Sequence, residues 1–214
     1  MNYIDFIEVI GVIAFAISGA LEGIRNHLDF LGVIILGIVT ATGGGVIRDV
    51  LLGIVPPTSI KTGYFIYIAL TVSIVAFIAP YIGRNRTRRQ FRTIFENTLV
   101  ITDALGLAAF TVTGMRLAYE VVPEATGFLY IFLGVLSGVG GGVIRDLLVN
   151  NIPYIMQRNV YATCSIIGAI VLHFLYRLTN LNMEIIIFIS FVIIFGTRMI
   201  AHIKNWHLPK AMRM

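Results

Sequence analysis

The heptad GGGVIRD stands at residues 43–49 and again at residues 140–146. The match extends outward from both copies. LGIVTATGGGVIRD aligns with LGVLSGVGGGVIRD when the second stretch is shifted by 97 residues, and GVIAFAISG (11–19) aligns with GLAAFTVTG (106–114) after a shift of 95. A chance repeat of this length is negligible, so the chain contains an internal duplication.

The composition identifies the class of protein that carries this repeat. Of 214 residues, 57% are hydrophobic and 13% are charged, and the mean hydropathy is +0.89. Soluble domains carry about 25% charged residues, so this chain has too few charges to cover a water-soluble fold. An integral membrane protein needs fewer charges, because its apolar surface faces lipid.

Seven apolar segments are long enough to cross a hydrocarbon core about 30 Å thick as helices of about 20 residues. They lie at about 4–21, 30–52, 62–83, 96–118, 127–149, 158–177 and 183–203. We therefore expect an all-α integral membrane protein with seven transmembrane helices, in an inverted 3+3 repeat plus one C-terminal helix. Its expected parts are a first three-helix repeat (1–83), a basic cytoplasmic loop (84–95), a second three-helix repeat (96–177), and the seventh helix with a basic C-terminal tail (178–214).

The number of helices in each copy sets the relative orientation of the two copies. Three is odd, so the second copy enters the membrane from the opposite side, as in many transporters with sites near the midplane. Five arginines crowd the stretch between the copies, and short loops rich in Lys and Arg stay in the cytoplasm. We expect the N-terminus outside, the C-terminus in the cytoplasm, and no nucleic-acid partner for these arginines.

Three consecutive glycines fall near the middle of the second and of the fifth apolar segment: Gly43, Gly44, Gly45, Gly140, Gly141 and Gly142. Small residues are common where membrane helices pack closely, which is one interpretation. A contiguous triple puts glycine on every side of the helix, which favours a second interpretation, a bend or local unwinding. In a membrane such a bend is tolerated only against protein or water, and its carbonyl groups could coordinate a cation.

The charged residues of the two heptads are Arg48, Asp49, Arg145 and Asp146. Neighbouring residues on a helix point about 100° apart, so we expect no good pair between the Arg and the Asp of one heptad, and we expect each arginine to find an acid on another helix. Matching depths in the membrane predict the pairs Glu8–Arg48 and Asp103–Arg145, one near each mouth of a pathway. Ionisable groups inside a membrane indicate function by default, and structural anchoring is the alternative.

Hydroxyl side chains near the predicted pathway are Ser18, Thr40, Thr42, Thr113 and Ser137. Such hydroxyls either line a polar path or bond to their own helix backbone. The four histidines share no ligand spacing and the chain has one cysteine, so we expect no metal site and no cofactor. No nucleophile with a base and no carboxylate pair is visible, so we expect a protein that is not an enzyme.

The paired glycine-rich heptads in a 3+3+1 inverted repeat resemble the prokaryotic members of the trimeric intracellular cation (TRIC) channel family, which are related to YadS-type bacterial membrane proteins. The resemblance covers essentially the whole chain. It implies a homotrimer in a prokaryotic cell membrane, in contact with membrane lipids, with a potassium-permeable pore in each protomer. The glycine-kinked second and fifth helices would line this pore, their six heptad glycines would form the constriction, and potassium or sodium would be the permeant ion. A secondary transporter of a small solute such as glycine is the alternative, because bacterial relatives are associated with that role.

Overall fold

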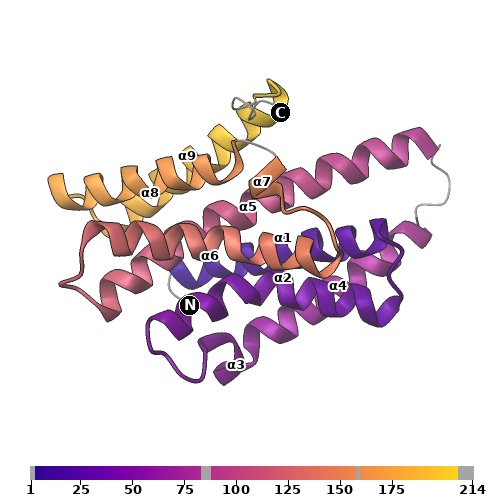
Figure 1. Ribbon diagram of the computed structural model, residues 1–214, viewed down its shortest axis with the longest axis horizontal. Helices are drawn as coiled ribbons and strands as arrows, with labels where there is room; N and C mark the ends of the chain where they lie inside the picture. The colour runs from indigo at the N-terminus through magenta and orange to yellow at the C-terminus, as the bar shows by residue number, and fades with distance from the viewer. Residues whose placement is uncertain (1–2, 83–87, 158–159, 207–214) are drawn as a thin grey trace, which may run out of the picture.

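The computed structural model describes residues 3–82, 88–157 and 160–206. Within these ranges the chain forms helices only (Figure 1). They are α1 (Tyr3–Arg25), α2 (Phe30–Leu51), α3 (Thr58–Thr62), α4 (Tyr64–Ile82), α5 (Arg88–Val121), α6 (Gly127–Leu148), α7 (Tyr154–Gln157), α8 (Tyr161–Leu178) and α9 (Met183–Ile203). Each of the seven predicted apolar segments overlaps one of the long helices, so the all-helical class is confirmed.

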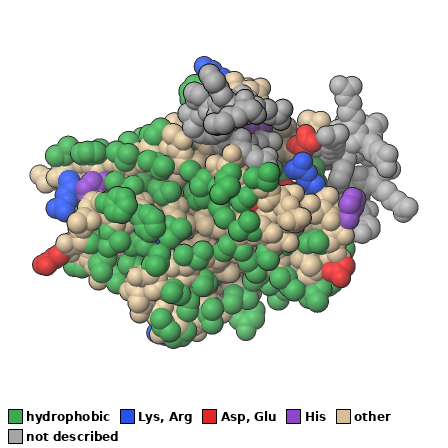
Figure 2. Space-filling model, in the orientation of Figure 1, with side chains coloured by type: hydrophobic (Ala, Val, Ile, Leu, Met, Phe, Trp, Pro, Cys, Tyr) green, Lys and Arg blue, Asp and Glu red, His purple; other side chains and the backbone are tan. Residues whose placement is uncertain are grey.

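Six of the described helices, namely α1, α2, α5, α6, α8 and α9, are long and apolar enough to cross a membrane. α4 contributes a described apolar stretch over Tyr64–Ala79, and a seventh span stays a prediction. Hydrophobic side chains cover the middle of the face in Figure 2, and charged side chains lie mainly toward its two ends. This distribution matches a lipid-facing belt between two aqueous surfaces, and the chain is a multi-pass integral membrane protein.

The stretch predicted as a loop over 84–95 is mostly helical. α5 begins at Arg88 and runs for 34 residues, because RRQFRTIF contains neither Gly nor Pro and is rich in good helix formers. Residues 83–87 and the tail 207–214, which also carries predicted basic positions, lie outside the described residues.

The two copies of the repeat end their second helices in the same way. Gly53 and Asn150, equivalent under the shift of 97, both adopt a left-handed backbone, with φ of 73° and 56°. In each copy the following residue donates its N–H to the aspartate carbonyl, Ile54 to Asp49 and Asn151 to Asp146, both at 2.8 Å. Glycine and asparagine are the residues that tolerate this conformation most readily, so the sequence after each heptad stops the helix.

The centre of the bundle is formed by α1 against α5 and by α2 against α6. These are the corresponding helices of the two copies. Phe15 of α1 and Phe110 of α5, equivalent under the shift of 95, stack with ring centroids 5.3 Å apart. The chain turns from α5 into α6 and from α8 into α9 at the same end of the bundle, at the left of Figure 1. α9, which has no counterpart in the first copy, packs on α5 and α8.

Candidate functional site

The heptad glycines lie where α2 and α6 touch. A methyl group at Gly44 would overlap the main-chain carbonyl oxygen of Ser137, and one at Gly141 would overlap that of Thr40. These two contacts are equivalent under the shift of 97 residues. A methyl group at Gly140 would lie 3.1 Å from the Cα of Gly44. Only glycine lets the two backbones approach this closely.

The predicted local unwinding at the glycines is wrong, and the predicted bend stays a prediction. α2 continues as helix from Phe30 to Leu51 and α6 from Gly127 to Leu148. Because both segments stay α-helical, their carbonyl groups belong to the regular hydrogen bonding of each helix. The close-packing interpretation is confirmed for Gly44 and Gly141, because each lies against a main-chain carbonyl of the other helix.

The third glycine of each triple faces an arginine instead. A methyl group at Gly45 would meet one atom of the described residues within 4 Å, Nη2 of Arg48 at 3.8 Å. A methyl group at Gly142 would lie 3.0 Å from the Tyr161 hydroxyl and 3.9 Å from Nη2 of Arg145. Gly45 therefore leaves room beside the Arg48 guanidinium group, whereas Gly142 is in tight contact with Tyr161.

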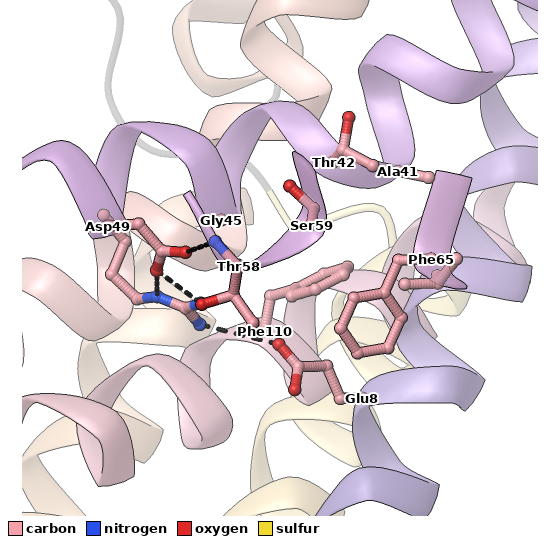
Figure 3. A pocket seen from close by; sticks show the side chains of 11 residues that line it. Glu8, Ala41, Thr42, Gly45, Asp49, Thr58, Ser59, Phe65 and Phe110 are labelled. Atoms are coloured by element: carbon pink, nitrogen blue, oxygen red, sulfur yellow. Dashed lines mark hydrogen bonds and ion pairs between the residues drawn. The ribbon is translucent and has the colours of Figure 1, made fainter. Parts of the chain in front are cut away.

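The first of these sites, the Arg48 half-site, consists of Arg48, Asp49 and Glu8 (Figure 3). Nε and Nη2 of Arg48 lie 2.9 Å and 2.7 Å from Oδ1 of Asp49. Nη1 lies 3.8 Å from Oε1 of Glu8, whose side chain is 22% exposed. The predicted Glu8–Arg48 pair is confirmed as a contact, although it is long and partly open to solvent.

A cavity of about 10 Å³ borders the Arg48 half-site, which is close to the space that one water molecule needs. Figure 3 shows Glu8 beside the rings of Phe65 and Phe110 at this cavity. Thr42 and Ser59 also line it. The hydroxyl of Ser59 is buried and has no hydrogen-bond partner among the described residues. The cavity therefore combines aromatic walls with a carboxylate and hydroxyl oxygens.

The second site, the Arg145 half-site, consists of Arg145, Asp146, Asp103 and Ser18. Nε and Nη2 of Arg145 both lie 2.8 Å from Oδ1 of Asp146. Nη1 donates to Oδ1 of Asp103 at 2.8 Å and to Oγ of Ser18 at 2.5 Å. Arg145 is completely buried. The predicted Asp103–Arg145 pair is confirmed as a contact, and it is shorter and more deeply buried than its counterpart.

The expectation that the neighbouring Arg and Asp of each heptad cannot pair is wrong. The arginine side chain is long enough to bend around the helix to the next residue, and the aspartate is short. Each aspartate uses its second oxygen elsewhere: Oδ2 of Asp49 accepts the N–H of Thr58 at 2.8 Å, and Oδ2 of Asp146 accepts that of Tyr154 at 2.9 Å. Each aspartate thus ties its arginine to the start of a short helix, α3 or α7.

The five predicted hydroxyl residues have different surroundings. Ser18 contacts Arg145, and Thr42 lines the cavity while donating to its own helix. Thr40 and Ser137 are buried against glycines of neighbouring helices. The hydroxyl of Thr113 is buried without a hydrogen-bond partner among the described residues. Only Thr42 of these five borders the cavity.

Other residues around the Arg145 half-site were not predicted. The ring of Tyr154 lies 5.4 Å from the Arg145 guanidinium carbon, and Arg198 of α9 lies 5.2 Å from the ring of Tyr161. Buried Glu22 accepts from the amides of Asn26 and Asn151, each at 3.0 Å. Tyr161 matches Tyr64 in the repeat, which is the signal that could have found it. Glu22 matches a leucine, and the repeat gives no signal for it.

The comparisons with known proteins agree with this architecture. The family model described as "Glycine transporter" matches residues 5–81 and 100–177. YadS, a UPF0126 inner membrane protein of Escherichia coli (strain K12), is 34% identical over 203 residues, covering 95% of this chain and 92% of YadS. Together these matches span both copies of the repeat.

Two solved structures share the fold over nearly the whole chain. One, described as "Structural basis for conductance through TRIC cation channels", has a TM-score of 0.84 and 35% identity, covering 100% of this chain and 99% of that one. A TRIC trimeric intracellular cation channel orthologue from Rhodobacter sphaeroides has a TM-score of 0.85 and 28% identity, covering 96% and 100%. The resemblance found in the heptads is thus confirmed: this chain belongs to the family of the YadS-type UPF0126 membrane proteins and the prokaryotic TRIC channels.

Proposed function

We propose that this chain is a monovalent cation channel, permeable to potassium, with a pore in each protomer lined by α2 and α6. The observation that carries the proposal is the charge balance of the two half-sites. Arg48 is faced by Asp49 and Glu8, and Arg145 by Asp146 and Asp103. Each arginine therefore meets two carboxylates, and with all groups ionised each half-site has a formal charge of minus one.

A negative charge at two depths favours cations over anions. Two buried arginines alone would repel potassium. Because each arginine is faced by two carboxylates, its positive charge is outweighed and this repulsion is removed. Electrostatic energies are larger in a partly buried site than in bulk water, and carboxylate oxygens are a common lining of cation pathways. The similarity to TRIC cation channels supports the same function.

The proposed path runs from the cavity beside Glu8, past Gly45 and the glycine crossing, to the Arg145 half-site. Hydroxyl oxygens of Thr42 and Ser59 at the cavity could replace part of the hydration shell of an ion. We further propose a homotrimer embedded in a cell membrane, seven spans, and the Arg48 half-site at the outer side. The trimer is the assembly named for the Rhodobacter sphaeroides relative.

A secondary transporter of a small solute such as glycine is the second candidate. The description of the matching family model and the inverted repeat favour it. Purified protein in planar bilayers and in proteoliposomes separates the two. We expect unitary potassium currents and no saturable glycine uptake. Saturable uptake without unitary currents would replace the channel by the transporter.

The variant Glu8→Gln is expected to reduce potassium conductance through the Arg48 half-site, because it removes one negative charge beside the cavity. The reduction should be larger in about 0.01 M KCl than in about 1 M KCl, since salt shortens the screening length from roughly 30 Å to roughly 3 Å. Single-channel conductance measured at both concentrations checks this.

Glu120→Gln is the matched control for Glu8→Gln. Glu120 is exposed and pairs with Arg116 at 2.6 Å, and it does not line the cavity. Equal reductions in the two variants would show that surface charge, and not the Arg48 half-site, attracts the ion.

A further inference from the structure

The two half-sites are equivalent in sequence but differ in their contacts. Nη1 of Arg145 reaches two partners at once, the carboxylate of Asp103 at 2.8 Å and the hydroxyl of Ser18 at 2.5 Å. The Arg145 side chain is completely buried. This half of the molecule is closed around its arginine.

The repeat names the equivalent partners of Arg48. The alignment of GVIAFAISG with GLAAFTVTG, with its shift of 95, places Asp103 opposite Glu8 and Ser18 opposite Thr113. Ser18 lies on α1 and accepts a hydrogen bond from Arg145, the arginine of the second copy. Thr113, on α5, is equivalent to Ser18 in the repeat. At this equivalent position its hydroxyl would accept a hydrogen bond from Arg48.

Arg48 makes a longer contact with its acidic partner than Arg145 does. Its Nη1 is 3.8 Å from Glu8, against 2.8 Å for the equivalent pair. Thr113 is 4% exposed and its hydroxyl has no hydrogen-bond partner among the described residues. Thr40 and Thr111, by contrast, donate to their own helix backbone. A buried hydroxyl without a partner is costly, and here it stands where the repeat predicts a partner for a cation.

We propose that Thr113 is a second docking point for Arg48, from which Arg48 closes the Arg48 half-site. In the docked position Nη1 contacts both Glu8 and the Thr113 hydroxyl, as Arg145 contacts Asp103 and Ser18. The movement toward Glu8 is on the order of 1 Å, the difference between the two pair distances. Thr113 is then a positioning residue that acts through Arg48, and it sets how often the cavity is open.

The docking proposal rests on the proposed function only in taking the cavity as part of the path. It therefore needs a readout that does not depend on current. Gly45 lines the cavity, and a Cβ there would meet only Nη2 of Arg48 among the described residues, at 3.8 Å, so the variant G45C places a thiol there. The native Cys164 is buried, and C164S removes it. The rate at which a small charged thiol reagent modifies G45C/C164S in detergent reports how often the cavity is open.

Adding T113V to this background is expected to raise the modification rate severalfold, up to about tenfold, because a hydrogen bond to a charged group is lost from the docked position. T113S keeps the hydroxyl and should leave the rate unchanged. T71V is the matched control, since Thr71 is exposed on α4 and bonds to its own helix. In an R48Q background T113V should have no further effect.

Equal rates for T113V, T113S and T71V would overturn the docking proposal. If R48Q does not fold, the comparison of T113V with T113S decides alone. Missing unitary currents in the unchanged protein would contradict the proposed channel and leave the modification rates as a valid test of docking. The two failures are therefore distinguishable.

Discussion

Replacing Asp103 by asparagine is expected to destabilise the protein by about 3 kcal/mol, the lower end of the cost of removing one partner from a buried ion pair. Arg145 is completely buried, and Asp103, 2% exposed, holds its Nη1 at 2.8 Å. Asp146 and Ser18 remain, which keeps the loss at the lower end. The apparent melting temperature in detergent should fall by roughly 6–12 °C.

Glu8→Gln is the matched control, because Glu8 occupies the equivalent position in the repeat. Its contact with Arg48 is 3.8 Å and its side chain is partly exposed. Pairs of this kind contribute about 0–1 kcal/mol, so the melting temperature should change little. Equal losses in the two variants would contradict the difference between the half-sites that the structure shows.

Replacing Gly44 by alanine is expected to cost about 1–3 kcal/mol or more, as overpacking does in a close-packed interior. The new methyl group would overlap the carbonyl oxygen of Ser137 and lie 3.2 Å from the main-chain nitrogen of Gly141. Backbone atoms cannot move aside as a flexible side chain can, so α2 and α6 must separate. Folding yield and melting temperature in detergent measure the loss.

The adjacent variant Gly45→Ala provides the control. Among the described residues its methyl group meets only Nη2 of Arg48, at 3.8 Å, and alanine gains up to about 1 kcal/mol over glycine in a helix. We expect unchanged or slightly raised stability. A loss equal to that of Gly44→Ala would mean that the glycines serve backbone flexibility and not the contact between the helices.

The length of the apolar segments predicted the long helices, and matching depths within the two aligned copies predicted the two cross-helix pairs. Once the copies are aligned, the depth of a residue along its helix follows from a rise of about 1.5 Å per residue. Glu8 and Asp103 then fall at the depths of Arg48 and Arg145. Both contacts are present in the structure.

The remaining features of the site depend on contacts between helices, which the hydrophobic pattern of one helix does not predict. The close packing at Gly44 depends on the carbonyl of Ser137, which lies on another helix. The Arg48–Asp49 bond depends on the reach of a long side chain, and α3 follows from the second oxygen of Asp49. The cavity gains Phe110 from a helix of the other copy. Helix periodicity records none of these relations.

The cation selectivity of the proposed path is measured by the reversal potential of single-channel currents across a tenfold KCl gradient. Two half-sites that each pair one arginine with two carboxylates predict a cation-selective path. The reversal potential should then approach the potassium limit of about 59 mV for a tenfold gradient of a singly charged ion. A reversal potential near zero, or of the sign expected for chloride, would contradict a cation-selective path.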